Sequence, residues 1–86
     1  NGSWTVYEYD ANGNPYKEYR YGTAGKIESV MELSYDANGF WQGQTETHYY
    51  DYETNKISRI AVWDSTGDII SDIEYNEDGT VKNINV

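Results

Sequence analysis

Alternating and β-branched stretches, separated by short turns, make up almost the whole chain. An aromatic residue, Asp or Asn, two small or polar residues, Gly, any residue and an apolar residue recur at 9–15, 35–41, 63–69 and 75–81. A degenerate copy lies at 21–27. The turn residues Gly13, Gly25, Gly39, Asn55, Gly67 and Gly79 follow one another at 12 to 16 residues. Such spacing is typical of strands, so each copy predicts a tight β-hairpin.

The residue types suit one kind of turn. Asp or Asn at the first turn position accepts a hydrogen bond from the backbone two residues on, and Gly at the fourth takes φ > 0 without strain. We therefore expect type I turns that close with a bulge. The predicted strands are 4–9, 14–21, 26–35, 40–49, 57–63, 68–75 and 80–86. They predict an all-β fold, an antiparallel meander of about seven strands in one sheet, in a single domain at 1–86.

The turns also predict a register, with the aromatic before Asp opposite the second residue after Gly, as in Tyr35/Trp41. Continued along the strands, this register places Arg20 opposite Glu28 and Glu74 opposite Lys82, pairs of opposite charge. It also aligns Leu33, Gly43 and Trp63 in one row, where Gly43 would leave room for the indole.

Strict alternation then gathers the aromatic and apolar side chains on one face. The second face is mixed, with Val62, Ile70 and Val86 in one row. Since one sheet does not shield an apolar face from water, we expect the meander to curl, to pair with a second copy, or to be covered by another domain. The segment 50–56 breaks the alternation and predicts a bulge or a longer loop.

Composition narrows the classes of function. The 86 residues carry 15 acidic and 6 basic side chains, a net charge of −9, which repels nucleic acid and anionic membranes. No apolar run approaches the roughly 20 residues of a membrane span and no leader pattern is present, so no membrane insertion is expected. The absence of Cys excludes disulfides and thiolate sites. Ten of the fourteen aromatic residues are Tyr, too many for a small core to hide.

Candidate chemistry is sparse. The segment 10–14 alternates oxygen ligands as a calcium loop does, but Gly stands fourth and the twelfth residue is Tyr21, so turn chemistry is favoured. His48 and Glu46 lie two apart on one strand face, too few ligands for a metal, and a solvent-facing histidine is the favoured interpretation. The serines have no paired base. We expect no enzyme, no catalytic residue, no metal and no cofactor.

The Tyr-Asp-x-x-Gly-x-apolar unit, best matched at 9–15 and 35–41, resembles the tyrosine-aspartate repeats of Rhs-type bacterial shell proteins. Its Tyr-x-x-Asn-Gly spacing, followed by Trp41-Gln42-Gly43, also resembles the variant MORN-type repeats of some bacterial surface proteins. A further similarity is to small uncharacterised secreted domains of gut bacteria. These resemblances imply antiparallel hairpins and a secreted, periplasmic or cell-surface setting in a bacterium.

We therefore expect a non-catalytic interaction module whose uncovered apolar surface meets a protein partner or a second copy, as a homodimer. The alternative is a carbohydrate-binding module, because Tyr and Trp rings can stack on sugars. Cross-strand packing alone also explains the aromatic residues. The candidate binding residues are Tyr19, Trp41, Tyr49, Trp63, Val62 and Ile70.

Overall fold

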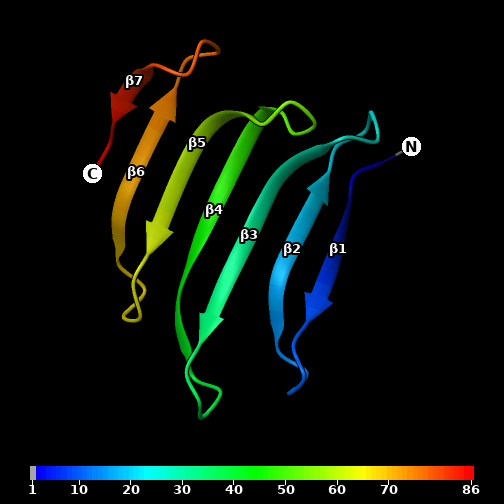
Figure 1. The fold of residues 1–86 in the computed structure, drawn as a ribbon, viewed down its shortest axis with the longest axis vertical. Coiled ribbons are helices and arrows are strands. Elements are labelled where there is room, and N and C mark those ends of the chain that lie inside the picture. Colours follow the sequence, from blue (N-terminus) through cyan, green and yellow to red (C-terminus); the bar gives the residue numbers. More distant parts are fainter. Residues whose placement is uncertain (1) are drawn as a thin grey trace.

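The structure, a computed structural model, describes residues 2–86 and contains one antiparallel sheet (Figure 1). Its strands lie side by side in chain order, with β1 and β7 at opposite edges. They are β1 (Trp4–Tyr9), β2 (Pro15–Tyr21), β3 (Ile27–Tyr35), β4 (Trp41–Asp51), β5 (Lys56–Trp63), β6 (Ile69–Tyr75) and β7 (Val81–Ile84). The predicted all-β meander of seven strands is confirmed. The sheet is not closed, because β1 pairs only with β2 and β7 only with β6. Residues 2–86 hold no helix that could cross a bilayer.

Most strand boundaries match the sequence to within one residue. The exceptions are β4, which continues to Asp51, and β7, which ends at Ile84 rather than at 86. A bulge at Tyr50 allows β4 to continue, since Tyr49 pairs with Ile57 and Asp51 pairs with Lys56. The predicted irregularity in segment 50–56 is therefore this bulge, followed by a short turn.

The turns have the predicted chemistry. In the β3–β4 turn the Gly39 amide donates to the Asp36 carbonyl at 3.0 Å, and the Asp36 amide donates to the Phe40 carbonyl at 2.9 Å. The Asp36 carboxylate accepts the amides of Asn38 and Phe40 at 2.9 and 3.0 Å. Gly39 has φ +85°, and Asn55, which takes the place of Gly in the β4–β5 turn, has φ +60°. This is the left-handed region that Gly and Asn tolerate best.

The register is confirmed next to each turn and changes directly beyond it. The predicted pairs Tyr9/Pro15, Tyr21/Ile27, Tyr35/Trp41, Trp63/Ile69 and Tyr75/Val81 are all present. In each hairpin the third residue after the left-handed turn residue is then an extra residue without a partner. These extra residues are Tyr16, Glu28, Gln42, Ser58, Ile70 and Lys82. Each hairpin thus carries a second bulge, which the sequence analysis did not predict.

The second bulge corrects the three pairings that were extended from the turns. Arg20 lies opposite Ser29, and Glu74 lies opposite Asn83. The row that contains Leu33 and Trp63 passes through Gln44. These pairings were wrong because one extra residue moves every later side chain of a strand to the other face of the sheet.

The predicted single aromatic face is wrong for the same reason. The extra residue after each turn exchanges the faces along the strand that follows it, so the end pairs of successive hairpins lie on opposite faces. The end pairs of the β2–β3, β4–β5 and β6–β7 hairpins, at the upper end in Figure 1, therefore share one face, which we name face A. The end pairs of the β1–β2, β3–β4 and β5–β6 hairpins, at the lower end, lie on the opposite face, face B.

The sheet is a single layer with almost no interior. It measures 40 × 34 × 19 Å. Within the described part of the chain, the buried hydrophobic residues are Val30, at 5% exposure, and Ala61, at 1%. Val30 lies on face A and Ala61 on face B, so neither face has a core of its own.

Candidate interaction surface

An apolar row crosses the middle of face A from edge to edge. Successive strand pairings align Val6, Tyr19, Val30, Thr47, Ile60, Ile73 and Ile84. Cross-strand neighbours of this kind stabilise a sheet through their side-chain contacts. The row is buried at Val30 and opens toward the edges, where Val6 and Ile84 are 43% and 64% exposed.

The upper end of face A continues this apolar surface. Trp4 and Tyr21 stack with ring centroids 4.9 Å apart, and Tyr49 packs edge-on against Tyr52 at 5.1 Å. Burial raises the pKa of the Tyr49 hydroxyl above its usual value. We name this region, together with the row below it, the apolar half of face A.

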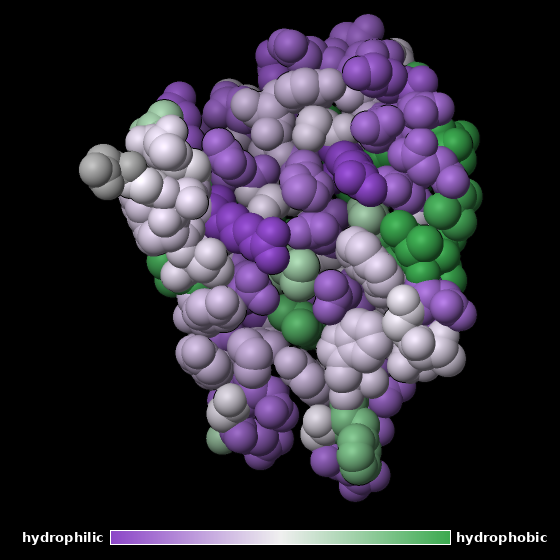
Figure 2. Space-filling model, turned by 180° about the vertical axis from the view of Figure 1, so that it is seen from behind, coloured by the Kyte–Doolittle hydropathy of each residue, from purple (hydrophilic) through white to green (hydrophobic). Residues whose placement is uncertain are grey.

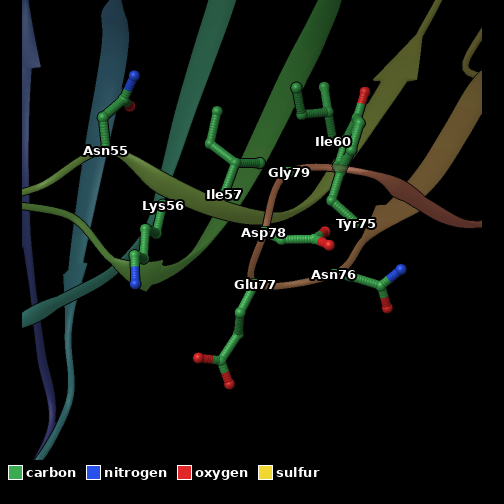
Figure 3. A pocket seen from close by; sticks show the side chains of 9 residues that line it. All are labelled: Asn55, Lys56, Ile57, Ile60, Tyr75, Asn76, Glu77, Asp78 and Gly79. Carbon is green, nitrogen blue, oxygen red and sulfur yellow. The ribbon is translucent and has the colours of Figure 1, made fainter.

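A hollow of about 420 Å³ lies in the apolar half, between β5 and the β6–β7 turn. Ile57, Ile60 and Tyr75 form its apolar wall, and the turn at 76–79 forms its rim (Figure 3). Lys56, Glu77 and Asp78 add one basic and two acidic groups to the lining. An open apolar hollow with a polar rim suits one side chain or ring of a partner.

The lower end of face A is polar. Lys17 lies opposite Glu32, with the amine 3.9 Å from the carboxylate, and the same amine lies 5.4 Å from the centre of the Tyr19 ring. Val62 belongs to this row but pairs with Ser71. The extra residue Ile70 lies beside Val62 along an open groove.

Face B carries a charged belt across the centre of the sheet. The belt consists of Glu18, Arg20, Glu46, His48, Arg59, Asp72 and Glu74, which two neighbouring rows bring together. Figure 2 shows this face as mostly hydrophilic, with hydrophobic side chains gathered along the margin next to β6 and β7. The belt lies directly behind the apolar row of face A, since adjacent residues of a strand point to opposite faces.

Asp72 and Arg59 form the most buried ion pair of the belt. The Arg59 Nε donates to Asp72 Oδ1 at 2.7 Å and a second nitrogen reaches Oδ2, while the Asp72 side chain is only 8% exposed. Asp72 lies opposite Ala61, whose small side chain leaves room for the carboxylate. The Arg59 hydrogen bonds lower the pKa of Asp72 below its usual value, against the opposing effect of burial. A two-pronged arginine contact of this kind is among the stronger ion pairs in proteins.

Glu46 links the other half of the belt. Its carboxylate lies 3.5 Å from both the Arg20 guanidinium and His48 Nε2, and Arg20 also lies 3.7 Å from Glu18. In residues 2–86, no three His, Asp or Glu side chains come together as ligands for a metal ion. The geometry is that of a surface network of opposite charges.

The lower end of face B is aromatic. Trp41 pairs with Tyr35, and Trp63 lies in the adjacent row with Leu33. The Tyr35 hydroxyl donates to the Pro15 carbonyl at 2.8 Å, which ties this end of β3 to β2. Both tryptophans are half-buried. We name this region the aromatic half of face B.

The structure divides the six predicted binding residues between the two faces. Tyr19 and Tyr49 lie in the apolar half of face A, and Val62 lies below them in the polar row with Ile70 at its side. Trp41 and Trp63 lie on face B. The predicted row of Val62, Ile70 and Val86 does not form, because Ile70 is the extra residue of a bulge and Val86 follows the end of β7.

Two outcomes concern the polar candidates. The Asp10 carboxylate accepts the amides of Asn12 and Asn14 at 2.9 and 3.0 Å, which is the turn chemistry favoured over a calcium loop. The bond between Asp72 and Arg59 was not predicted from the sequence. Nor was the joint row of Ile60 and Ile73, which only the bulges bring into register.

Searches against protein-family models, curated proteins and solved structures find no significant match to this chain.

Proposed function

We propose that this chain is a non-catalytic interaction module that docks the apolar half of face A against another protein surface, either a partner or a second copy. One observation carries the proposal: a sheet of seven strands buries only Val30 and Ala61 among the hydrophobic residues that the structure describes. Sheets of this size normally bury one face against a second layer. A docked partner would supply that layer.

The distribution of charge supports face A as the docking surface. Face B balances its central polar groups internally, through Arg59 with Asp72 and through Glu46 with Arg20 and His48. The side chains of the apolar row on face A are not stabilised in this way within the sheet, because apolar surface is stabilised only when it is removed from water. Interface centres have this composition, apolar and aromatic with few charges.

The hollow beside Ile57 supplies a place for an anchoring side chain. Residues that dominate binding energy sit in desolvated pockets near the centre of an interface and are enriched in aromatic types. We therefore expect the partner to present an aromatic or branched apolar residue to the wall formed by Ile57, Ile60 and Tyr75.

Paired variants on β5 test the proposal. Ile60→Lys places a charge in the apolar row, whereas Val62→Lys places the same charge on the same strand and face in the polar row. Size-exclusion chromatography with light scattering, over a range up to high micromolar concentration, should show an assembly that Ile60→Lys reduces at least tenfold and Val62→Lys preserves. A wild-type monomer throughout would count against self-association, and the opposite order of effects would move the interface to Val62 and Ile70.

An extracytoplasmic bacterial setting belongs to the same proposal. Its support is the resemblance of the turn unit to repeats of bacterial surface and shell proteins. Fractionation of the native host with an antibody against the chain tests it, and signal confined to the cytoplasmic fraction would contradict it.

The second candidate function is carbohydrate binding by the aromatic half of face B. It is favoured by Trp41 and Trp63, which the fold places on one face beside Tyr35. Tryptophan fluorescence against a panel of polysaccharides should respond in the wild type and lose the response in Trp41→Phe. Trp4→Phe, on face A, serves as the control. No change with any glycan would remove this candidate.

A further inference from the structure

Strand β1 is an unprotected edge of the sheet. All six of its residues are exposed, including Trp4 at 48%, Tyr7 at 47% and Tyr9 at 60%. It contains no Pro and a single charge, that of Glu8. Edge strands in stable monomers usually carry proline, several charges or a covering segment, because their free backbone groups otherwise pair with another chain.

The opposite edge is better protected. β7 has four residues, of which Lys82 is an extra bulge residue at the start of the strand. Short length, lysine and a bulge are three devices that prevent pairing at an edge. The two edges of this sheet therefore differ in their capacity to add a strand.

The hydrogen bonds of the first turn identify the free backbone groups of β1. The Asp10 amide donates to the Asn14 carbonyl, and the Asp10 carbonyl accepts from the Gly13 amide, so both groups of Asp10 face β2. Backbone groups of successive residues alternate between the two sides of a strand. Glu8 and Val6 therefore face β2, whereas Thr5, Tyr7 and Tyr9 direct their amides and carbonyls outward.

We propose that β1 pairs antiparallel with β1 of a second copy, around a two-fold axis at Tyr7 that is perpendicular to the sheet. Tyr7 would then exchange two hydrogen bonds with Tyr7 of the other copy, and Thr5 would exchange two with Tyr9 in each direction. Every outward backbone group of the strand gains a partner in this register. The product is one continuous sheet with twice the seven strands of the single chain.

A second copy suits this edge for two reasons. A two-fold axis perpendicular to the sheet keeps face A continuous with face A, with the apolar rows of the two copies offset by two residues where they meet. It also places Glu8 opposite Val6 rather than opposite Glu8, which avoids a direct pair of like charges. Pairing of β1 with β7 of another copy, with face A kept on the same side, would instead be parallel, since the two strands run in the same direction, and would engage only the four residues of β7.

This inference deepens the proposed function, because it names a second copy as the partner, but it uses the edge rather than face A. The two surfaces can therefore be tested apart. Ile60→Lys reports on face A, and changes to the outward groups of β1 report on the edge.

Proline scanning of the two edges supplies the first test. Thr5→Pro removes an outward amide of β1 and leaves its pairing with β2 intact, and circular dichroism should confirm the fold. Ile84→Pro is the matched control, because the Asn85 amide bonds the Asp72 carbonyl and the Ile84 amide therefore points away from β6. Light scattering should show a wild-type dimer that Thr5→Pro converts to a monomer and Ile84→Pro preserves.

Disulfide trapping tests the register in a chain that has no Cys of its own. Two residues in a hydrogen-bonded antiparallel pair have Cα atoms about 5.5 Å apart, which a disulfide can span. Tyr7→Cys should therefore cross-link under mild oxidation. Thr5→Cys should not, because the two substituted positions would lie four residues apart along the strand, about 14 Å.

Three results would overturn the inference. They are a wild type that stays monomeric at high micromolar concentration, a Thr5→Pro variant that keeps the dimer, and cross-linking of Thr5→Cys as efficient as that of Tyr7→Cys. A dimer that Ile60→Lys abolishes and Thr5→Pro leaves unchanged would reject the edge while retaining the proposed function of face A.

Discussion

The two faces of the sheet expose different kinds of side chains to water, although both faces are formed by alternate residues of the same strands. On β5, Ile60 points into the apolar row of face A between Thr47 and Ile73, whereas its neighbour Ala61 lies in the charged belt of face B, beside Asp72. Face B satisfies its charges through internal ion pairs, which tolerate solvent. Face A leaves branched and aromatic side chains uncovered.

This difference separates a face whose charged groups are paired within the sheet from a face whose apolar groups remain exposed. Ion pairs and turn hydrogen bonds hold the hairpins together without a second layer. The apolar row contributes hydrophobic stabilisation mainly at Val30, where neighbouring strands shield the side chain from water. Burial by a partner would stabilise the exposed residues of the row further.

The largest effect should come from Gly43→Ala. Gly43 has φ +117° next to the extra residue of the β3–β4 bulge, and an added Cβ would press against the carbonyl oxygen of Trp63. The neighbour is backbone rather than the indole predicted from the sequence, so it has little freedom to yield. Backbone strain and overpacking together should lower the free energy of unfolding by about 3 kcal/mol, as measured by urea denaturation.

Gly67→Ala is the control for that variant. Gly67 also has positive φ, at +87°, but nothing lies within 4 Å of an added Cβ. Its cost should be limited to strain, about 1 kcal/mol. Equal costs at the two glycines would mean that the β3–β4 bulge does not approach the Trp63 backbone.

A smaller effect is expected from Val30→Ala in the apolar row. Removing two buried carbon atoms should cost about 1–2 kcal/mol. Ile84→Ala, in the same row but 64% exposed, should change the free energy of unfolding by less than about 0.5 kcal/mol. Similar costs for the two substitutions would show that the row is equally covered at its centre and its edge.

The charged belt should make the stability of the protein depend on pH. The Arg59 hydrogen bonds lower the pKa of Asp72 in the folded state, relative to about 3.9 when unfolded. Its stabilisation is therefore fully present above the unfolded pKa and is lost as the pH falls through the lowered folded pKa. Thermal unfolding between pH 7 and pH 2 should show Asp72→Asn losing less stability on acidification than the wild type.

The acid sensitivity should be reduced in that variant rather than abolished. Threonine hydroxyls also lower the pKa values of the turn carboxylates Asp51, Asp64 and Asp78. An acid profile identical to that of the wild type would show that the Asp72–Arg59 pair does not favour the charged carboxylate in solution.

The smallest effect should come from Asn55→Gly, which changes a turn and neither face. Asn55 adopts φ +60°, a region where Gly has less strain, but Gly also gains freedom in the unfolded chain. Because these two effects oppose each other, the free energy of unfolding should change by less than about 0.4 kcal/mol. A larger loss would mean that the Asn55 side chain has a structural role beyond the backbone angle.

The local sequence was sufficient for the strand order, the turns and the pairs beside them. Asp36 and Gly39 specify their turn by hydrogen bonds within five residues, and Tyr35/Trp41 follows from that geometry. Because each such decision is local, six turns in succession leave the meander as the simplest topology.

Only the tertiary structure decided which side chains share a face. The extra residue three positions after each left-handed turn residue, such as Gln42 or Ile70, depends on pairing with a neighbouring strand and is not marked by a particular residue type in this sequence. Because side chains alternate with a period of two, one extra residue exchanges the faces of everything that follows it. That exchange separated Trp41 and Trp63 from Tyr19, brought Ile60 beside Ile73, and joined Arg59 to Asp72.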